Sequence, residues 1–260
     1  MNYFTRIVLI FVLIITNVRA DVLEIKVDQT PVSLPYWLAS DTHYGGVIIV
    51  RGGEQAHWSM LLTHFADQLA NNGWSVVLLN CNDGNTVPWI KQVPEVISAL
   101  RQNKNKRIVL VHYGDQLNQS IDYFSQPQAK LINGLVMLSA YDNQNNLDKP
   151  SSLRFPLFDI AGQFDYDTVL TQMQIREKEF KQHNYLSLEM PGAHHDYEYS
   201  QRMVLAFIHG WMSKLPIIEP QKPPILASYI EPVYSSASLI AVLHEGNWNG
   251  YIDDPDEPKQ

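Results

Sequence analysis

Cysteine is nearly absent from this sequence. Cys81 is the single cysteine among 260 residues, so the chain has neither an internal disulfide nor a metal cluster built from cysteines. It follows the aliphatic run at residues 76–79, and this position predicts a partly buried free thiol at the end of a strand. Side-chain packing, without cross-links, must hold the fold together.

Positive charge and long apolar runs are also scarce. The chain has 19 basic and 27 acidic residues, and its formal net charge is -8. Nucleic acid and anionic membrane surfaces are poor partners for such a chain. The apolar run at residues 7–15 is too short for a comfortable membrane span.

Residues 1–20 have the features of a secretory signal peptide. Arg6 precedes the apolar run, and residues 18–20 offer small or short side chains where a signal peptidase reads them. Cleavage before Asp21 would leave 17 basic and 27 acidic residues, a net charge of -10. An uncleaved anchor is the alternative, and no cysteine near residue 20 can carry a lipid. We therefore expect a soluble exported protein, periplasmic or secreted, with no stable membrane insertion after cleavage.

Hydrophobic patterns between residues 21 and 215 alternate strands with helices. This alternation predicts a single α/β domain with a mostly parallel sheet and helices on both faces. The expected strands cover residues 22–27, 36–39, 47–50, 74–79, 134–139, 155–161 and 185–190, with one more beginning at 108. The expected helices cover residues 59–72, 93–100, 116–124, 168–183 and 200–214.

The composition changes at residue 216. Residues 216–260 hold seven of the fifteen prolines and seven acidic residues against two lysines. Such a composition favours an extended, non-globular tail. Two apolar stretches, at 225–230 and 239–243, are suited to lie against the domain or a partner.

Residues 108–116 predict a buried strand, a sharp turn and then a helix. Hydrolases carry their nucleophile in this setting, as the serine of Gly-x-Ser-x-Gly, where the glycines let strand and helix approach each other closely. The corresponding position here is Gly114, which has no side chain, and His112 and Gln116 replace the two flanking glycines. The turn therefore lacks the nucleophile.

Five segments resemble the α/β-hydrolase superfamily, and most closely an uncharacterised bacterial family of exported hydrolase-like proteins. They lie, in the order of that superfamily, at residues 45–53, 72–75, 108–116, 159–165 and 191–195. The resemblance covers about residues 35–215 and implies an α/β-hydrolase-like fold. The gap at residues 140–154 is too short for a large helical lid. A fold alone does not supply a reaction.

The resemblance also implies an acid–base pair. His195 matches the general base, with His194 as an adjacent competitor, and Asp165 matches the acid that orients it. Each residue has a structural alternative. The histidine can simply bond to the domain, and Asp165 or Asp167 can cap the helix expected near residue 168.

The same resemblance assigns an oxyanion loop to Gly52 and Gly53. Their backbone amides would act with the amide after the nucleophile position, that of Asp115, whose carboxylate would oppose an oxyanion. Asp115 is itself a weak alternative nucleophile, although its place in the turn favours capping of the next helix. Ser120 and Ser139 lie in the wrong places for attack.

Metal binding is a third possible function. The imidazoles of His57, His112, His194 and His195 could gather with Asp165 at one sheet edge, but no histidine pair has the helical spacing of a metalloprotease motif. We therefore expect no metal and no cofactor.

Together these features favour a pseudo-hydrolase that binds an unknown small molecule or protein partner, or has a structural role. The alternative is an ester or amide hydrolase in which His195 and Asp165 activate water, or which uses an unrecognised nucleophile.

Overall fold

The computed structural model describes residues 20–40, 43–53, 59–79, 87–143, 153–180 and 184–217. These residues belong to a compact unit that ends at Ile218, and a second unit, Glu219–Gln260, lies outside the described residues. The expected signal peptide, Cys81, His57 and nearly all of the expected tail lie outside them as well. No helix within the described ranges is long and apolar enough to cross a bilayer.

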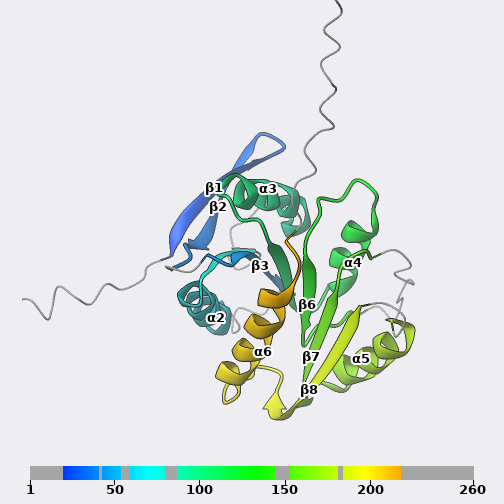
Figure 1. Ribbon diagram of the computed structural model, residues 1–260. Coiled ribbons are helices and arrows are strands. Elements are labelled where there is room, and N and C mark those ends of the chain that lie inside the picture. Colours follow the sequence, from blue (N-terminus) through cyan, green and yellow to red (C-terminus); the bar gives the residue numbers. More distant parts are fainter. Residues whose placement is uncertain are drawn as a thin grey trace, which may run out of the picture. The chain divides into compact units, whose positions relative to one another are not determined.

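The described residues form one eight-stranded sheet, in the order β1-β2-β4-β3-β5-β6-β7-β8 (Figure 1). Strand β2 pairs antiparallel with β1 and with β4, and every other pair of neighbours is parallel. The strands are β1 (Asp21–Val27), β2 (Thr30–Trp37), β3 (Gly45–Gly52), β4 (Trp74–Leu79), β5 (Ile108–Gly114), β6 (Gly134–Leu138), β7 (Leu157–Phe164) and β8 (Tyr185–His194).

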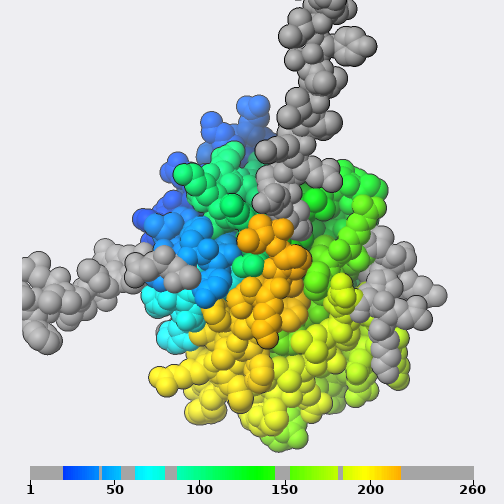
Figure 2. Space-filling view, viewed as in Figure 1, coloured from blue at the N-terminus to red at the C-terminus, as the bar shows by residue number. Residues whose placement is uncertain are grey.

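Helices cover both faces of the sheet, as the sequence predicted. They are α2 (Ser59–Asn71), α3 (Trp89–Gln102), α4 (Leu117–Ser125), α5 (Asp167–Phe180) and α6 (Gln201–Lys214). Apolar residues of α2 and α6 share one core, and those of α3 and α4, with the end of α5, share the core on the other face. Figure 2 shows the face on which α6 lies across the sheet.

The central strands are aliphatic because both of their faces are covered. All seven residues of β5 are buried, and residues 47–50 of β3 are fully buried. A parallel strand covered on both sides reads as a continuous apolar run, which is why these strands could be located from sequence. Helix α6 instead buries residues four apart, Val204, Ile208 and Met212, because only one side of it meets the sheet.

Several predicted boundaries were wrong. Helix α3 begins at Trp89 rather than at residue 93, because the buried Trp89 side chain belongs to the core and Pro94 is accommodated inside the helix. Strand β2 covers Thr30–Trp37 rather than 36–39, because it pairs along its whole length with β1. Strand β8 continues past Pro191 to His194.

Candidate functional site

The ends of four parallel strands bring the expected site residues to one edge of the sheet. Gly52 of β3 pairs with Gly114 of β5, and Phe164 of β7 pairs with His194 of β8. The carboxyl ends of parallel strands share an edge, where sites of α/β proteins collect. Segments that resemble the α/β-hydrolase superfamily therefore end at the same edge of the sheet.

Asp165 and His195 meet at this edge. The Nδ1 atom of His195 lies 2.5 Å from Oδ1 of Asp165, and the side chains are 8% and 0% exposed. An ionised carboxylate can only accept hydrogen bonds, so Nδ1 carries the proton in this pair. The expected contact is present, while a catalytic role for the pair stays a prediction.

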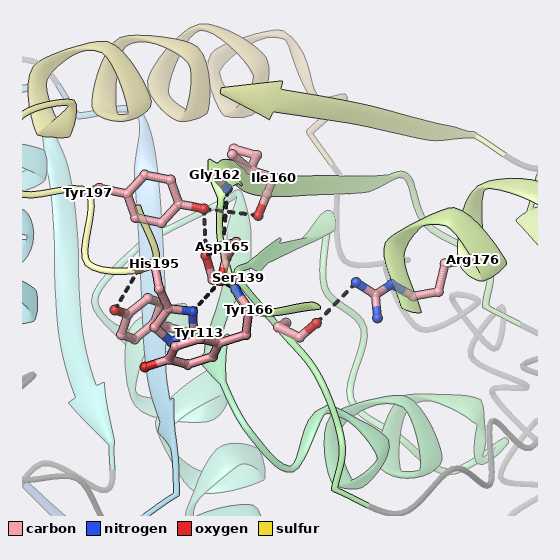
Figure 3. A network of polar contacts seen from close by, with 10 residues as sticks. Tyr113, Ser139, Ile160, Gly162, Asp165, Tyr166, Arg176, His195 and Tyr197 are labelled. Carbon is pink, nitrogen blue, oxygen red and sulfur yellow. Dashed lines mark hydrogen bonds and ion pairs between the residues drawn. The ribbon is translucent and has the colours of Figure 1, made fainter. Parts of the chain in front are cut away.

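The Asp165 carboxylate has three further donors (Figure 3). Oδ2 accepts from the Gly162 amide at 3.1 Å and from the Ser139 hydroxyl, and Oδ1 accepts from the Tyr166 amide at 2.8 Å. These bonds direct the carboxylate toward His195, so the alternative in which Asp165 caps α5 is wrong.

Tyrosine rings enclose the His195 imidazole. The Tyr166 ring stacks on it with centroids 4.1 Å apart, Tyr113 lies tilted at 5.7 Å, and Tyr141 meets it edge-on at 6.2 Å. The Tyr113 hydroxyl also donates to the His195 carbonyl at 3.2 Å. This enclosure leaves only 7% of His195 exposed.

His194, the competing histidine, points elsewhere. Its side chain is exposed and its ring lies 5.4 Å from that of Phe164. His194 is therefore exposed whereas the adjacent His195 is buried, and only His195 contacts Asp165.

Gly114 ends β5 with a backbone that side chains rarely adopt. Its φ is +84°, and a Cβ placed there would lie 3.3 Å from the Gly52 carbonyl oxygen. Gln116 also has a positive φ, +66°, and precedes α4 as its N-cap residue. The turn therefore has two left-handed residues before the helix begins at Leu117.

His112 is fully buried beneath this turn, where a hydrolase elbow has its first glycine. Its Nδ1 lies 2.8 Å from the Ser120 hydroxyl, and its Nε2 lies 2.8 Å from the Asp115 carbonyl oxygen. Burial lowers the pKa of His112 to about 4, so the ring is neutral at neutral pH. A neutral ring that donates from Nε2 to the carbonyl accepts the Ser120 proton at Nδ1. The Ser120 hydroxyl is thus hydrogen-bonded to His112. Because both ring nitrogens of His112 have partners, this histidine is not placed to bind a metal.

Asp115 contacts both the oxyanion loop and the segment after β6. A Cβ on Gly52 would lie 1.6 Å from the Asp115 carbonyl oxygen, so only glycine permits this approach. The Asp115 carboxylate accepts from the Gln116 amide at 2.6 Å, the Asn143 amide at 3.2 Å and the Asn143 side chain. A nucleophile would need this carboxylate to face a substrate, whereas here it binds the chain itself.

The cap of α4 comes from a residue that the sequence did not suggest. Asp142 accepts from the Asn118 amide at 2.6 Å, so the cap predicted for Asp115 is supplied from the segment after β6. Burial raises the pKa of Asp142 to about 6, although the Asn118 amide acts in the opposite direction. The nearby Asp115 carboxylate raises this pKa further.

Among the residues that the structure describes, no three histidine, cysteine, aspartate or glutamate side chains are grouped to hold a metal ion. Between β6 and β7, residues 139–143 and 153–156 form no helix, and residues 144–152 lie outside the described part.

Comparisons with known proteins identify the fold. No family model matches the chain, and no curated protein does. Solved structures do match. An a/b serine hydrolase without lid from Xanthomonas campestris is 17% identical to this chain, with a TM-score of 0.55. The match covers 78% of this chain and 97% of that protein's chain. The Pf2001 esterase from Pyrococcus furiosus has a TM-score of 0.59 and 16% identity, covering 76% and 93%. An alpha-beta serine hydrolase homologue from Coxiella burnetii has a TM-score of 0.56 and 11% identity, covering 75% and 98%.

The chain has the α/β-hydrolase fold. The predicted fold class is confirmed, and the identities are too low for these likenesses to carry a reaction to this chain.

Proposed function

We propose that this protein is an exported α/β-hydrolase-like protein without serine-hydrolase chemistry, and that its site edge binds a small molecule or a protein partner. The single observation that carries the proposal is the nucleophile turn. Gly114 offers no attacking atom there, and the side chains of His112, Ser120 and Asp115 are bonded to the turn itself.

The electrostatics of the turn support the same proposal. Acyl transfer needs N–H donors aimed at the oxygen where negative charge develops. The Asp115 carboxylate accepts from the Gln116 amide in the turn and from the Asn143 amide after β6. It places a negative charge beside Gly53, where a Cβ would lie 3.5 Å from the Asp115 Cβ. An oxyanion would be repelled by that charge.

Export and family remain part of the proposal. Residues 1–20 support a cleaved signal peptide, and the five resembling segments support the uncharacterised exported family. N-terminal sequencing of the mature protein should begin at Asp21. A start at Met1 in membrane fractions would replace the signal peptide with an anchor.

A second candidate is ester or amide hydrolysis by water. The 2.5 Å contact between His195 and Asp165 favours it, because an oriented imidazole is what a general base requires. Water activated in this way needs no serine at residue 114.

Hydrolysis of a short-chain p-nitrophenyl ester separates the two candidates. The purified mature protein is compared with His195→Ala, Asp165→Asn and His194→Ala, the last being a matched exposed histidine. The binding proposal expects the same background turnover in all four proteins. Turnover that His195→Ala and Asp165→Asn abolish, while His194→Ala keeps it, would contradict the binding proposal and establish the water mechanism.

A further inference from the structure

Ser139 is held in an unfavourable backbone conformation at the end of β6. Its φ is +44°, a region that side-chain-bearing residues rarely adopt, and the residue is completely buried. Such a conformation is energetically unfavourable and persists where surrounding contacts impose it. Three groups contact Ser139 here: its amide donates to the Ile160 carbonyl oxygen at 2.7 Å, and its hydroxyl contacts Asp165 and Tyr197.

The Ser139 hydroxyl links two other groups. It donates to Oδ2 of Asp165, and its oxygen lies 2.7 Å from the Tyr197 hydroxyl (Figure 3). Because the single Ser139 proton goes to the carboxylate, the Tyr197 hydroxyl is the donor in the second contact. Burial raises the pKa of Tyr197 well above its ordinary value, and the nearby Asp165 raises it further, so that the phenol keeps its proton.

Tyr197 is itself fixed from two sides. It is 2% exposed and has a φ of +54°. Its single hydroxyl proton is shared between the Ser139 oxygen at 2.7 Å and the Ile160 carbonyl oxygen of β7 at 3.2 Å. The two residues with positive φ therefore lie at the end of β6 and just after β8, where they contact each other, and Ser139 alone contacts the Asp165 carboxylate. Neither residue contributes to the nucleophile turn.

We infer that Ser139 and Tyr197 are positioning residues, which hold the Asp165 carboxylate so that His195 keeps its proton on Nδ1. The hydrogen bonds run from Tyr197 to Ser139 to Asp165, and His195 donates to the same carboxylate from the other side. With Nδ1 protonated, the lone pair of the neutral imidazole lies on Nε2, the acceptor that a base or a ligand-binding group presents. The carboxylate thereby fixes both the tautomer and the orientation of the His195 ring. This inference rests on the proposed site, but it holds whether the site binds or hydrolyses.

Proton NMR of the mature protein tests the inference. The Nδ1 proton of His195 should give a far-downfield resonance, assigned by its loss in Asp165→Asn. We expect this resonance to move or vanish in Ser139→Ala and Ser139→Gly, and to move less in Tyr197→Phe. Ser120→Ala is the matched control, because Ser120 is an equally buried serine that hydrogen-bonds to a different histidine. It should leave the resonance unchanged.

The two Ser139 variants separate positioning from stability. Glycine relieves the positive φ and alanine does not, so Ser139→Gly should melt closer to the unaltered protein, while the resonance moves or vanishes in both variants. An unchanged resonance in folded Ser139→Ala and Ser139→Gly would overturn the inference, as would a missing resonance in the unaltered protein. The ester assay above does not depend on this signal, so the two proposals can fail separately.

Discussion

The two halves of the sheet edge differ in the groups to which their polar side chains are hydrogen-bonded. In the acid–base half, hydrogen bonds from three segments converge on Asp165 and orient His195. In the nucleophile half, His112 and Asp115 bond to the turn and to neighbouring chain, and Gly114 carries no reactive atom. We take this difference between the two halves as support for the proposed binding role over acyl transfer.

The largest difference between the halves should appear in stability. Asp165→Ala leaves the buried donors of His195 and Ser139 without their acceptor and should lower the free energy of unfolding by about 3–5 kcal/mol. Asp115→Ala removes a half-buried carboxylate and should lower it by about 1–2 kcal/mol. Urea denaturation of both variants measures the two losses. Equal losses would break the comparison.

His112, in the nucleophile half, should make the free energy of unfolding depend on pH. The unfolded chain protonates His112 near its ordinary pKa of 6.5, whereas the folded protein resists protonation down to about 4. The free energy of unfolding therefore falls by about 3 kcal/mol as the pH decreases through that window.

Protonation of Asp142 has the opposite effect on the free energy of unfolding. The folded protein protonates it at about 6, above the ordinary 3.8, so acidification through that window raises the free energy of unfolding by about 3 kcal/mol. The two groups should nearly cancel in the unaltered protein. Between about pH 7 and about pH 4, denaturation should become easier in Asp142→Asn and harder in His112→Gln, each relative to the unaltered protein. Parallel pH profiles for all three proteins would contradict these assignments.

Restoring the nucleophile should have the smallest effect. Gly114→Ser meets a φ of +84° and a close Gly52 carbonyl, so it should lower the free energy of unfolding by about 1–2 kcal/mol. We expect no fluorophosphonate labelling of this serine, because His112 and Asp115 still fill the turn. Labelling that His195→Ala abolishes would show instead that the missing side chain is the only defect.

The sequence predicted the fold well because its signals are local. Aliphatic runs such as residues 47–50 and amphipathic spacing such as that of α6 follow directly from burial on two faces or on one. The resemblance of the segments at residues 159–165 and 191–195 was sufficient to predict the contact between Asp165 and His195.

The supporting contacts could not be read from sequence. Ser139 is 26 residues from Asp165 and 58 residues from Tyr197 along the chain, and no local sequence pattern indicates hydrogen bonds between such distant residues. The sequence presents Ser139 only as a poorly placed nucleophile, and it favours Asp115 for the cap that Asp142 provides. The positive φ of Ser139 and of Gln116 was equally invisible, because glycine and asparagine are the residues that usually signal it.

The intact mass of the mature, unaltered protein after treatment with a fluorophosphonate probe tests the central claim most directly. The probe forms a covalent bond with an activated serine, and the account predicts no adduct, because Gly114 has no hydroxyl and the hydroxyls of Ser120 and Ser139 are bonded to His112 and Asp165. A stoichiometric adduct on any serine, lost in His195→Ala, would contradict the account and identify a working serine hydrolase.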